Sequence, residues 1–93
     1  MKVTKTTINM ARRRGFAITV TEDDELNGGK TSVEFAALDN GEPADEHAAR
    51  YTLTADGLFF AGSCLKNAEE WPYWIESEAY LRTLLPAMAN EIK

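Results

Sequence analysis

Hydrophobic and polar residues alternate along two stretches in the first half of the chain. Residues 16–21 place three apolar side chains on one side: Phe16, Ile18 and Val20. Residues 31–38 repeat the alternation with Val33, Phe35 and Ala37. A period of two residues is typical of a half-buried strand. The pattern predicts an antiparallel hairpin with a long tip at residues 22–30, where Asn27-Gly28-Gly29 is typical of a tight turn.

A second, shorter hairpin is predicted in the middle of the chain. Tyr51 and Leu53 alternate with polar residues over residues 50–54, and residues 58–61 supply the return strand. Gly57 lies in the turn between the two strands, where glycine adopts a positive φ at little cost. We therefore expect two hairpins within residues 16–62.

The last third of the chain has the period of an amphipathic helix, which we place at residues 72–92. Its apolar stripe consists of Trp74, Leu81, Leu85, Met88 and Ile92. Pro72 suits a first helical turn, because the N–H that proline lacks has no helical partner there. Pro86 lies inside the helix but off the stripe, so we expect a kink near Pro86 rather than a break.

Two segments fit more than one structure. The basic N-terminal segment, residues 1–15, fits a short helix capped by Thr6 or Thr7, or an edge strand over residues 2–10. Residues 43–49 fit a short helix or a loop equally well.

These elements predict one α+β domain that spans residues 1–93. We expect two layers: an antiparallel sheet of about four strands and the C-terminal helix packed on one face. A chain of 93 residues buries enough apolar surface for one modest core. The residues expected to point into this core are Phe16, Ile18, Val20, Val33, Phe35, Tyr51, Leu53, Leu58, Phe60, Trp74, Leu81, Leu85 and Met88.

Charge is unevenly distributed around a net value of −5. Residues 1–20 hold five basic and no acidic side chains, whereas residues 21–49 hold nine acidic side chains and one lysine. The net value argues against a general nucleic-acid binder or an anionic-membrane binder, since both are usually basic. The uneven distribution still permits local contact with phosphates at the basic end.

Composition excludes several kinds of chemistry. With one cysteine and one histidine, the chain lacks the ligands for a structural zinc site and cannot form an internal disulfide. Residues 28–31 resemble the end of a phosphate-binding loop but lack its first glycine. We expect no metal, no cofactor and no catalytic residues. Since there is no long apolar run and no apolar signal segment, we expect a soluble, cytoplasmic protein.

Three groups of residues are candidates for binding a partner. The basic group is Lys5, Arg12, Arg13 and Arg14, and guanidinium groups suit phosphates or acidic protein surfaces. The acidic group is Glu22, Asp23, Asp24 and Glu25, which can mimic nucleic-acid phosphates or simply solvate a hairpin tip. The third group is an aromatic rim of Phe59, Trp71, Tyr73 and Tyr80, since aromatic side chains often anchor interfaces. Phe59 belongs to it because it points outward if Leu58 and Phe60 point inward.

In overall character, the chain resembles the small, mostly acidic accessory proteins of phages and mobile elements, which include anti-CRISPR and other anti-defence inhibitors. The compact α+β pattern, the acidic residues 22–46, the cluster Arg12–Arg14 and the lack of an active-site signature carry this resemblance. These families share no motif, so no functional residue is transferred. The resemblance implies a non-enzymatic inhibitor that binds a host nucleic-acid-handling protein or ribonucleoprotein complex and blocks nucleic-acid access.

Two alternatives from other functional classes stay open. One is an accessory protein that binds nucleic acid directly through Arg12–Arg14. The other is a small enzyme that uses the carboxylates of residues 22–25 beside the aromatic residues 71–74, as paired carboxylates do in glycoside hydrolysis. Neither a membrane partner nor a required oligomer is expected, although an exposed strand edge or Phe59 is compatible with self-association.

Overall fold

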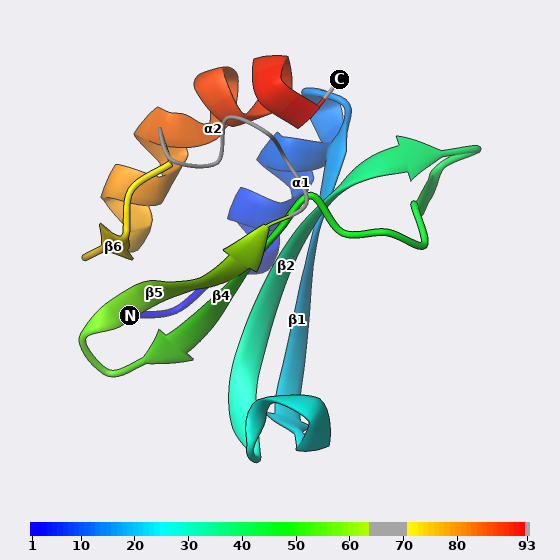
Figure 1. Cartoon of the computed structure of the whole chain (residues 1–93). Helices are drawn as coiled ribbons and strands as arrows, with labels where there is room; N and C mark the ends of the chain where they lie inside the picture. The colour runs from blue at the N-terminus through cyan, green and yellow to red at the C-terminus, as the bar shows by residue number, and fades with distance from the viewer. Residues whose placement is uncertain (64–70, 93) are drawn as a thin grey trace.

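The computed structural model describes residues 1–63 and 71–92, which form a sheet with two helices on one of its faces (Figure 1). The first half of the chain contains α1 (Lys5–Arg13), β1 (Phe16–Asp24), the 3₁₀ turn η1 (Glu25–Asn27), β2 (Lys30–Asp39) and β3 (Glu42–Pro43). The second half contains β4 (Ala49–Thr54), β5 (Gly57–Ser63), β6 (Trp74–Ile75) and α2 (Glu78–Ile92). The predicted α+β class is confirmed. Cys64 lies outside the described residues.

The sheet is antiparallel, with the order β1-β2-β4-β5-β6, and β3 pairs separately with β2. Both predicted hairpins are present, because Phe16 pairs with Ala37 in the first and Thr54 pairs with Gly57 in the second. The sheet is larger than the expected four strands, since the two-residue strands β3 and β6 add to it. Residues 44–48 form no helix, so the loop alternative for the segment after Pro43 is correct.

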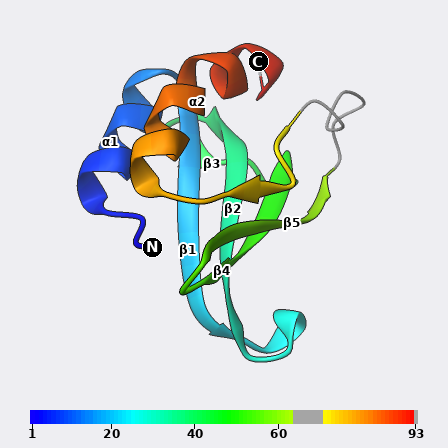
Figure 2. The same ribbon diagram turned by 90° about the vertical axis from the view of Figure 1, so that its left-hand side faces the viewer.

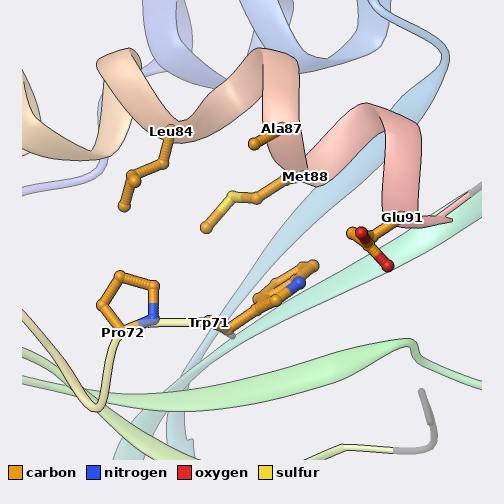
Figure 3. A pocket seen from close by; sticks show the side chains of 6 residues that line it. All are labelled: Trp71, Pro72, Leu84, Ala87, Met88 and Glu91. Atoms are coloured by element: carbon orange, nitrogen blue, oxygen red, sulfur yellow. The ribbon is translucent and has the colours of Figure 1, made fainter. Parts of the chain in front are cut away.

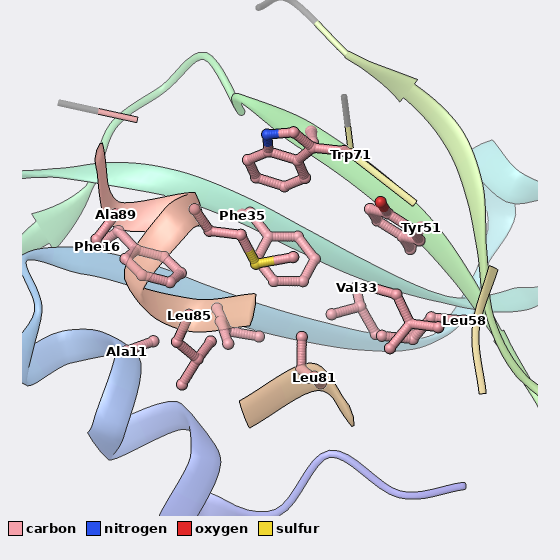
Figure 4. Close-up of a cluster of buried hydrophobic side chains, with 14 residues drawn as sticks. Ala11, Phe16, Val33, Phe35, Tyr51, Leu58, Trp71, Leu81, Leu85 and Ala89 are labelled. Carbon is pink, nitrogen blue, oxygen red and sulfur yellow. The ribbon is translucent and has the colours of Figure 1, made fainter. Parts of the chain in front are cut away.

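The core lies between the sheet and the helices and centres on Phe35 (Figure 4). The Phe35 ring is 5.6 Å from Tyr51 and 5.6 Å from Trp71, both edge-on. The Tyr51 hydroxyl donates to the Pro72 carbonyl at 2.6 Å, which satisfies its polar end. Burial raises the pKa of the Tyr51 phenol, and the electrostatic interaction with Tyr80 raises it to a lesser extent. Thirteen residues were expected in this core, and Trp74 is the exception, with 46% of its surface exposed.

The C-terminal helix begins at Glu78, so its expected start at residue 72 was wrong. Trp74 lies on the edge strand β6, where it pairs with Phe59 and points away from the core. The Ser77 hydroxyl accepts from the Tyr80 backbone N–H at 3.1 Å and caps the helix. The helix continues through Pro86, which is exposed on its outer side.

The N-terminal segment forms a helix, so the edge-strand alternative was wrong. Thr4 is the N-cap residue, rather than the expected Thr6 or Thr7, and its side chain does not cap its own helix. Instead, the start of α1 is bonded by a carboxylate from the other helix, that of Glu78 in α2. Glu78 Oε2 accepts from the Thr4 backbone N–H at 2.7 Å and from the Thr4 hydroxyl at 2.6 Å. The buried Thr7 hydroxyl donates to the same oxygen at 2.6 Å.

Arg82 completes this connection between the helices. Its Nε donates to the Thr7 hydroxyl at 2.9 Å, and its Nη2 lies 3.8 Å from Glu78 Oε1. Partial burial raises the pKa of Glu78, but the hydrogen bonds from Thr4 and Thr7 and the charge of Arg82 outweigh that effect and hold the pKa below its ordinary value. The ionised carboxylate therefore stabilises the fold.

Glu78→Gln should lower the free energy of unfolding at neutral pH by about 1.5 kcal/mol, because the hydrogen bonds from Thr4 and Thr7 then reach a neutral oxygen and are weaker. Since the folded-state pKa is lowered, the stabilisation is complete above the ordinary pKa of 4.5 and disappears as pH falls through the folded-state value. Urea unfolding between pH 7 and pH 3 should therefore show the two proteins converging in stability at acidic pH. Glu76→Gln, at an exposed carboxylate two residues earlier, is the matched control. A constant difference at all pH values would contradict this role.

Candidate binding surface

The predicted acidic and basic groups lie at opposite ends of the β1–β2 hairpin. Arg12–Arg14 precede the start of β1, whereas Glu22–Glu25 comprise the last three residues of β1 and the first residue of η1. Eight residue steps from Arg14 to Glu22, at about 3.4 Å per residue of antiparallel strand, separate them by roughly 27 Å. The hairpin end that carries the acids projects beyond the helices (Figures 1 and 2). The two groups therefore do not form one mixed patch.

The acidic tip, which we define as residues 22–27, is held in one conformation by its own polar groups. Asp24 accepts from the Leu26 backbone N–H at 3.1 Å and from the Ser32 hydroxyl at 2.8 Å. Asn27 donates to the Ser32 hydroxyl at 3.0 Å and to the Thr52 hydroxyl at 3.1 Å. These bonds fold the tip onto the sheet and explain why Ser32, on the face opposite the helices, is fully buried.

This arrangement divides the four predicted acids by role. The side chains of Glu22, Asp23 and Glu25 are exposed, whereas Asp24 is half-buried and occupied in shaping the tip. Beside them, Leu26 is 90% exposed. Three carboxylates and one apolar side chain therefore form the outer surface of the tip.

The sheet face opposite the helices, here called the outer face, joins the acidic tip to part of the aromatic rim. Directly paired residues form a row across this face: Thr21, Ser32, Thr52, Phe59 and Trp74. Asn27 of the tip bonds to Ser32 and Thr52, and Phe59 is the next residue in the row. Ser32 and Trp74 are three strand spacings apart, about 14 Å. The tip and the exposed aromatic side chains thus border one continuous surface.

Phe59, Tyr73 and Trp74 form an aromatic patch at the edge of this surface. The Phe59 and Trp74 rings stack with centroids 6.2 Å apart, and Tyr73 meets Phe59 edge-on at 6.4 Å. Trp74 Nε1 donates to the Asp56 carbonyl at 2.8 Å, which fixes the indole over the β4–β5 turn. Tyr73 is 72% exposed. Rings that are both oriented and exposed are suited to anchor a partner.

Two members of the expected rim do not belong to this patch. Trp71 is only 7% exposed and stacks on Tyr51 in the core, so its assignment to the rim was wrong. Tyr80 is partly exposed, but it lies in the first turn of α2, which packs on the opposite face of the sheet. Trp74, expected in the core, takes their place.

The basic residues lie on α1, in the helix layer. The side chains of Lys5, Arg12, Arg13 and Arg14 are all exposed, and Arg12 Nη1 donates to the Gly41 carbonyl at 2.8 Å. The structure therefore does not join the basic group to the surface formed by the tip and the aromatic patch.

A small hollow of about 100 Å³ lies between α2 and the segment before β6 (Figure 3). It is lined by Trp71, Pro72, Leu84, Ala87, Met88 and Glu91. Pockets that bind small molecules usually measure about 300–1,000 Å³. The hollow thus accommodates a side chain rather than a nucleotide or a sugar.

Within residues 1–63 and 71–92, no three metal-binding side chains lie close enough to hold an ion. No helix of the described part is long and apolar enough to cross a membrane. Of the aromatic residues named by the carboxylate-enzyme alternative, Trp71 lies in the core, whereas Tyr73 and Trp74 lie at the edge of the surface onto which the acidic tip folds.

Sequence reasoning missed three residues of this surface. Leu26 lies in the predicted tip but was not singled out, although a leucine directly after four acids is a detectable exception. Asn27 was assigned only to a turn, because its contact with Thr52 spans 25 residues. Trp74 was placed in the helix, although Ser77-Glu78 is a helix-start signal that would have placed Trp74 outside it.

Comparisons of the chain with protein-family models, curated protein sequences and solved structures found no significant match.

Gly57→Ala should disrupt the support of the aromatic patch. Gly57 has φ +129°, and an added Cβ would collide with the Ile75 carbonyl and lie 2.9 Å from Trp74 Nε1. Urea unfolding should show a loss of more than about 1 kcal/mol. Gly41→Ala is the matched control, since Gly41 has φ +82° and open space around it. Equal losses in the two variants would mean that only backbone strain, and not the close approach of β6, restricts position 57.

Proposed function

We propose that this protein is a non-enzymatic interaction protein that inserts its acidic tip into a basic, nucleic-acid-binding groove of a partner complex. The single observation that carries the proposal is the ordered acidic tip, which presents three exposed carboxylates around Leu26, a side chain 90% exposed. A solvated hairpin end needs neither a defined conformation nor an exposed leucine.

The conformation of the tip supports binding with little loss of entropy. Asp24 and Asn27 hold it through side-chain hydrogen bonds to Ser32 and Thr52 on two neighbouring strands. Fewer degrees of freedom are then lost when a partner engages it, which favours affinity. The carboxylates at positions 22, 23 and 25 supply negative charges that steer the tip toward a basic surface.

The aromatic patch supports a contact broader than the tip itself. Phe59 and Trp74 continue the row that begins at Ser32, on which the tip is folded. An acidic projection beside exposed aromatic rings combines electrostatic steering with apolar anchors, and aromatic anchors often provide much of the binding energy. This combination favours a protein groove as the partner surface over free nucleic acid, which would repel the carboxylates.

Basic grooves of this kind are typical of proteins that hold nucleic acid. Occupation of such a groove blocks the access of nucleic acid, which is the mode of action implied by the resemblance to phage anti-defence inhibitors. The proposal therefore places the protein in the cytoplasm of a host cell, bound to a defence complex.

Tagged wild-type protein should capture a stoichiometric nucleic-acid-handling complex from host lysate, and an added oligonucleotide should release that complex. The double variant Asp23→Lys/Glu25→Lys should lose the capture, because it reverses the charge that faces the groove. Leu26→Ala should weaken it by about tenfold, as expected for loss of an apolar anchor. Quantitative mass spectrometry of the eluates, followed by titration of the purified complex, measures both effects.

The matched control is Glu42→Lys/Glu46→Lys. It makes the same change in net charge at exposed positions that follow β2, at the end of the hairpin opposite the acidic tip. It should retain the captured complex. Retention by the tip variant, or capture that an excess of the oligonucleotide does not release, would contradict the proposal. Recovery of no stoichiometric partner, together with unimpaired defence in cells that express the protein, would also overturn it.

A further inference from the structure

Helix α1 presents a continuous basic face to solvent. Lys5, Asn9, Arg12 and Arg13 are spaced so that they fall within about 100° of the helix circumference, and all four are exposed. Asn9, Arg12 and Arg13 line a shallow, open hollow of about 380 Å³. The hollow is therefore bordered by amide and guanidinium donors.

The basic side chains of this face have no acidic partner in the described part of the chain, although the protein is acidic overall. The close contacts between basic and acidic side chains there are those of His47 with Glu34, at 3.1 Å, and of Arg82 with Glu78, at 3.8 Å. Of the basic side chains on this face, Arg12 makes a hydrogen bond within the protein. It donates to the carbonyl of Gly41, which lies in the turn between the paired residues Asp39 and Glu42. Lys5 and Arg13 make no comparable hydrogen bond within the described residues.

Helix stability does not explain the whole face. Arg12 and Arg13 lie in the last turn, where positive charge is favourable to the helix dipole. Lys5 is the first residue of the helix, where positive charge is unfavourable. The negative charge that suits that end comes from Glu78 of α2. Helix α1 itself therefore contains no acidic residue that would repel an anion.

We infer that this face of α1 is a second binding site, separate from the acidic tip, that takes the phosphate backbone of nucleic acid. Arginine forks bind phosphate oxygens in pairs, and the contact between Arg12 and Gly41 already orients one of them. Lys5 lies seven residues from Arg12, about 10 Å along the helix axis, which matches about three nucleotide steps of one strand. Repeated charges at this spacing favour a polynucleotide over a single anion.

A nucleic acid also fits this face better than the other polyanionic partners. An anionic membrane is usually bound by basic residues together with apolar anchors, and this face holds only Lys5, Asn9, Arg12 and Arg13. An acidic protein usually presents apolar or aromatic groups beside its charges, for which the face has no counterpart. The face offers positive charges and hydrogen-bond donors, and phosphate groups match both without any apolar contact.

The test is titration of purified protein into a fluorescent DNA duplex at low salt. We expect weak binding, with a Kd of about 10⁻⁴ M, at the weak end of non-specific binding to DNA. The net charge of −5 opposes tighter binding. The logarithm of the binding constant should fall against the logarithm of salt with a slope of about −2 to −3, as expected for two or three phosphate contacts. Lys5→Glu and Arg13→Glu should each weaken binding by about tenfold and make the slope smaller.

Lys30→Glu is the matched control, since it makes the same change in net charge at an exposed position next to the acidic tip. It should weaken binding much less than Arg13→Glu, and Asp23→Asn/Glu25→Gln should not weaken it at all. The test uses no partner complex, so its outcome is independent of the function proposed for the tip. The inference is wrong if no binding occurs at low salt, if Lys30→Glu and Arg13→Glu act equally, or if polyglutamate or anionic vesicles bind as tightly as the duplex.

Discussion

One carboxylate oxygen joins the two helices, and the arrangement of the charged surfaces depends on it. Glu78 Oε2 accepts hydrogen bonds from Thr4 and Thr7, residues more than 70 positions away in the chain. Because Glu78 is also the first residue of α2, one negative charge lies at the N-terminal ends of both helices, where the helix dipole favours it. Burial raises the pKa of Glu78, but these hydrogen bonds and the charge of Arg82 lower it by more. The Glu78 carboxylate is therefore ionised at neutral pH.

This connection separates positive from negative charge. With Glu78 supplying the negative charge at its first turn, α1 needs no acid of its own and keeps an entirely basic outer face. Both helices pack on one face and toward one end of the sheet, so the other end of the β1–β2 hairpin projects freely (Figure 1). The acids are carried on that projecting end, about 27 Å from the arginines. A net charge of −5 therefore describes two surfaces of opposite sign rather than one mildly acidic surface.

Local patterns predicted the parts of the fold that local physics controls. Alternation identified both hairpins, and the stripe through Leu81, Leu85 and Met88 identified the second helix. The short strand β6 was missed because two residues carry no periodicity, and its place depends on pairing with Phe59 across 15 positions. Likewise, the run of acids located the tip, but only the bonds of Asp24 showed which carboxylate shapes the tip and which ones are exposed.

The separation of the two surfaces restricts how one copy can sit on a nucleoprotein complex. If the acidic tip occupies a groove that normally holds nucleic acid, α1 lies about 27 Å from that groove, or about eight nucleotide steps along a strand. A strand bound elsewhere on the complex can then reach Lys5 and Arg13 without competing with the tip for the groove. The tip and α1 would thus act on different components of the same complex, the tip on its protein and α1 on its nucleic acid. Opposite charges at opposite ends also orient the approach, because the groove attracts the tip and repels the basic helix.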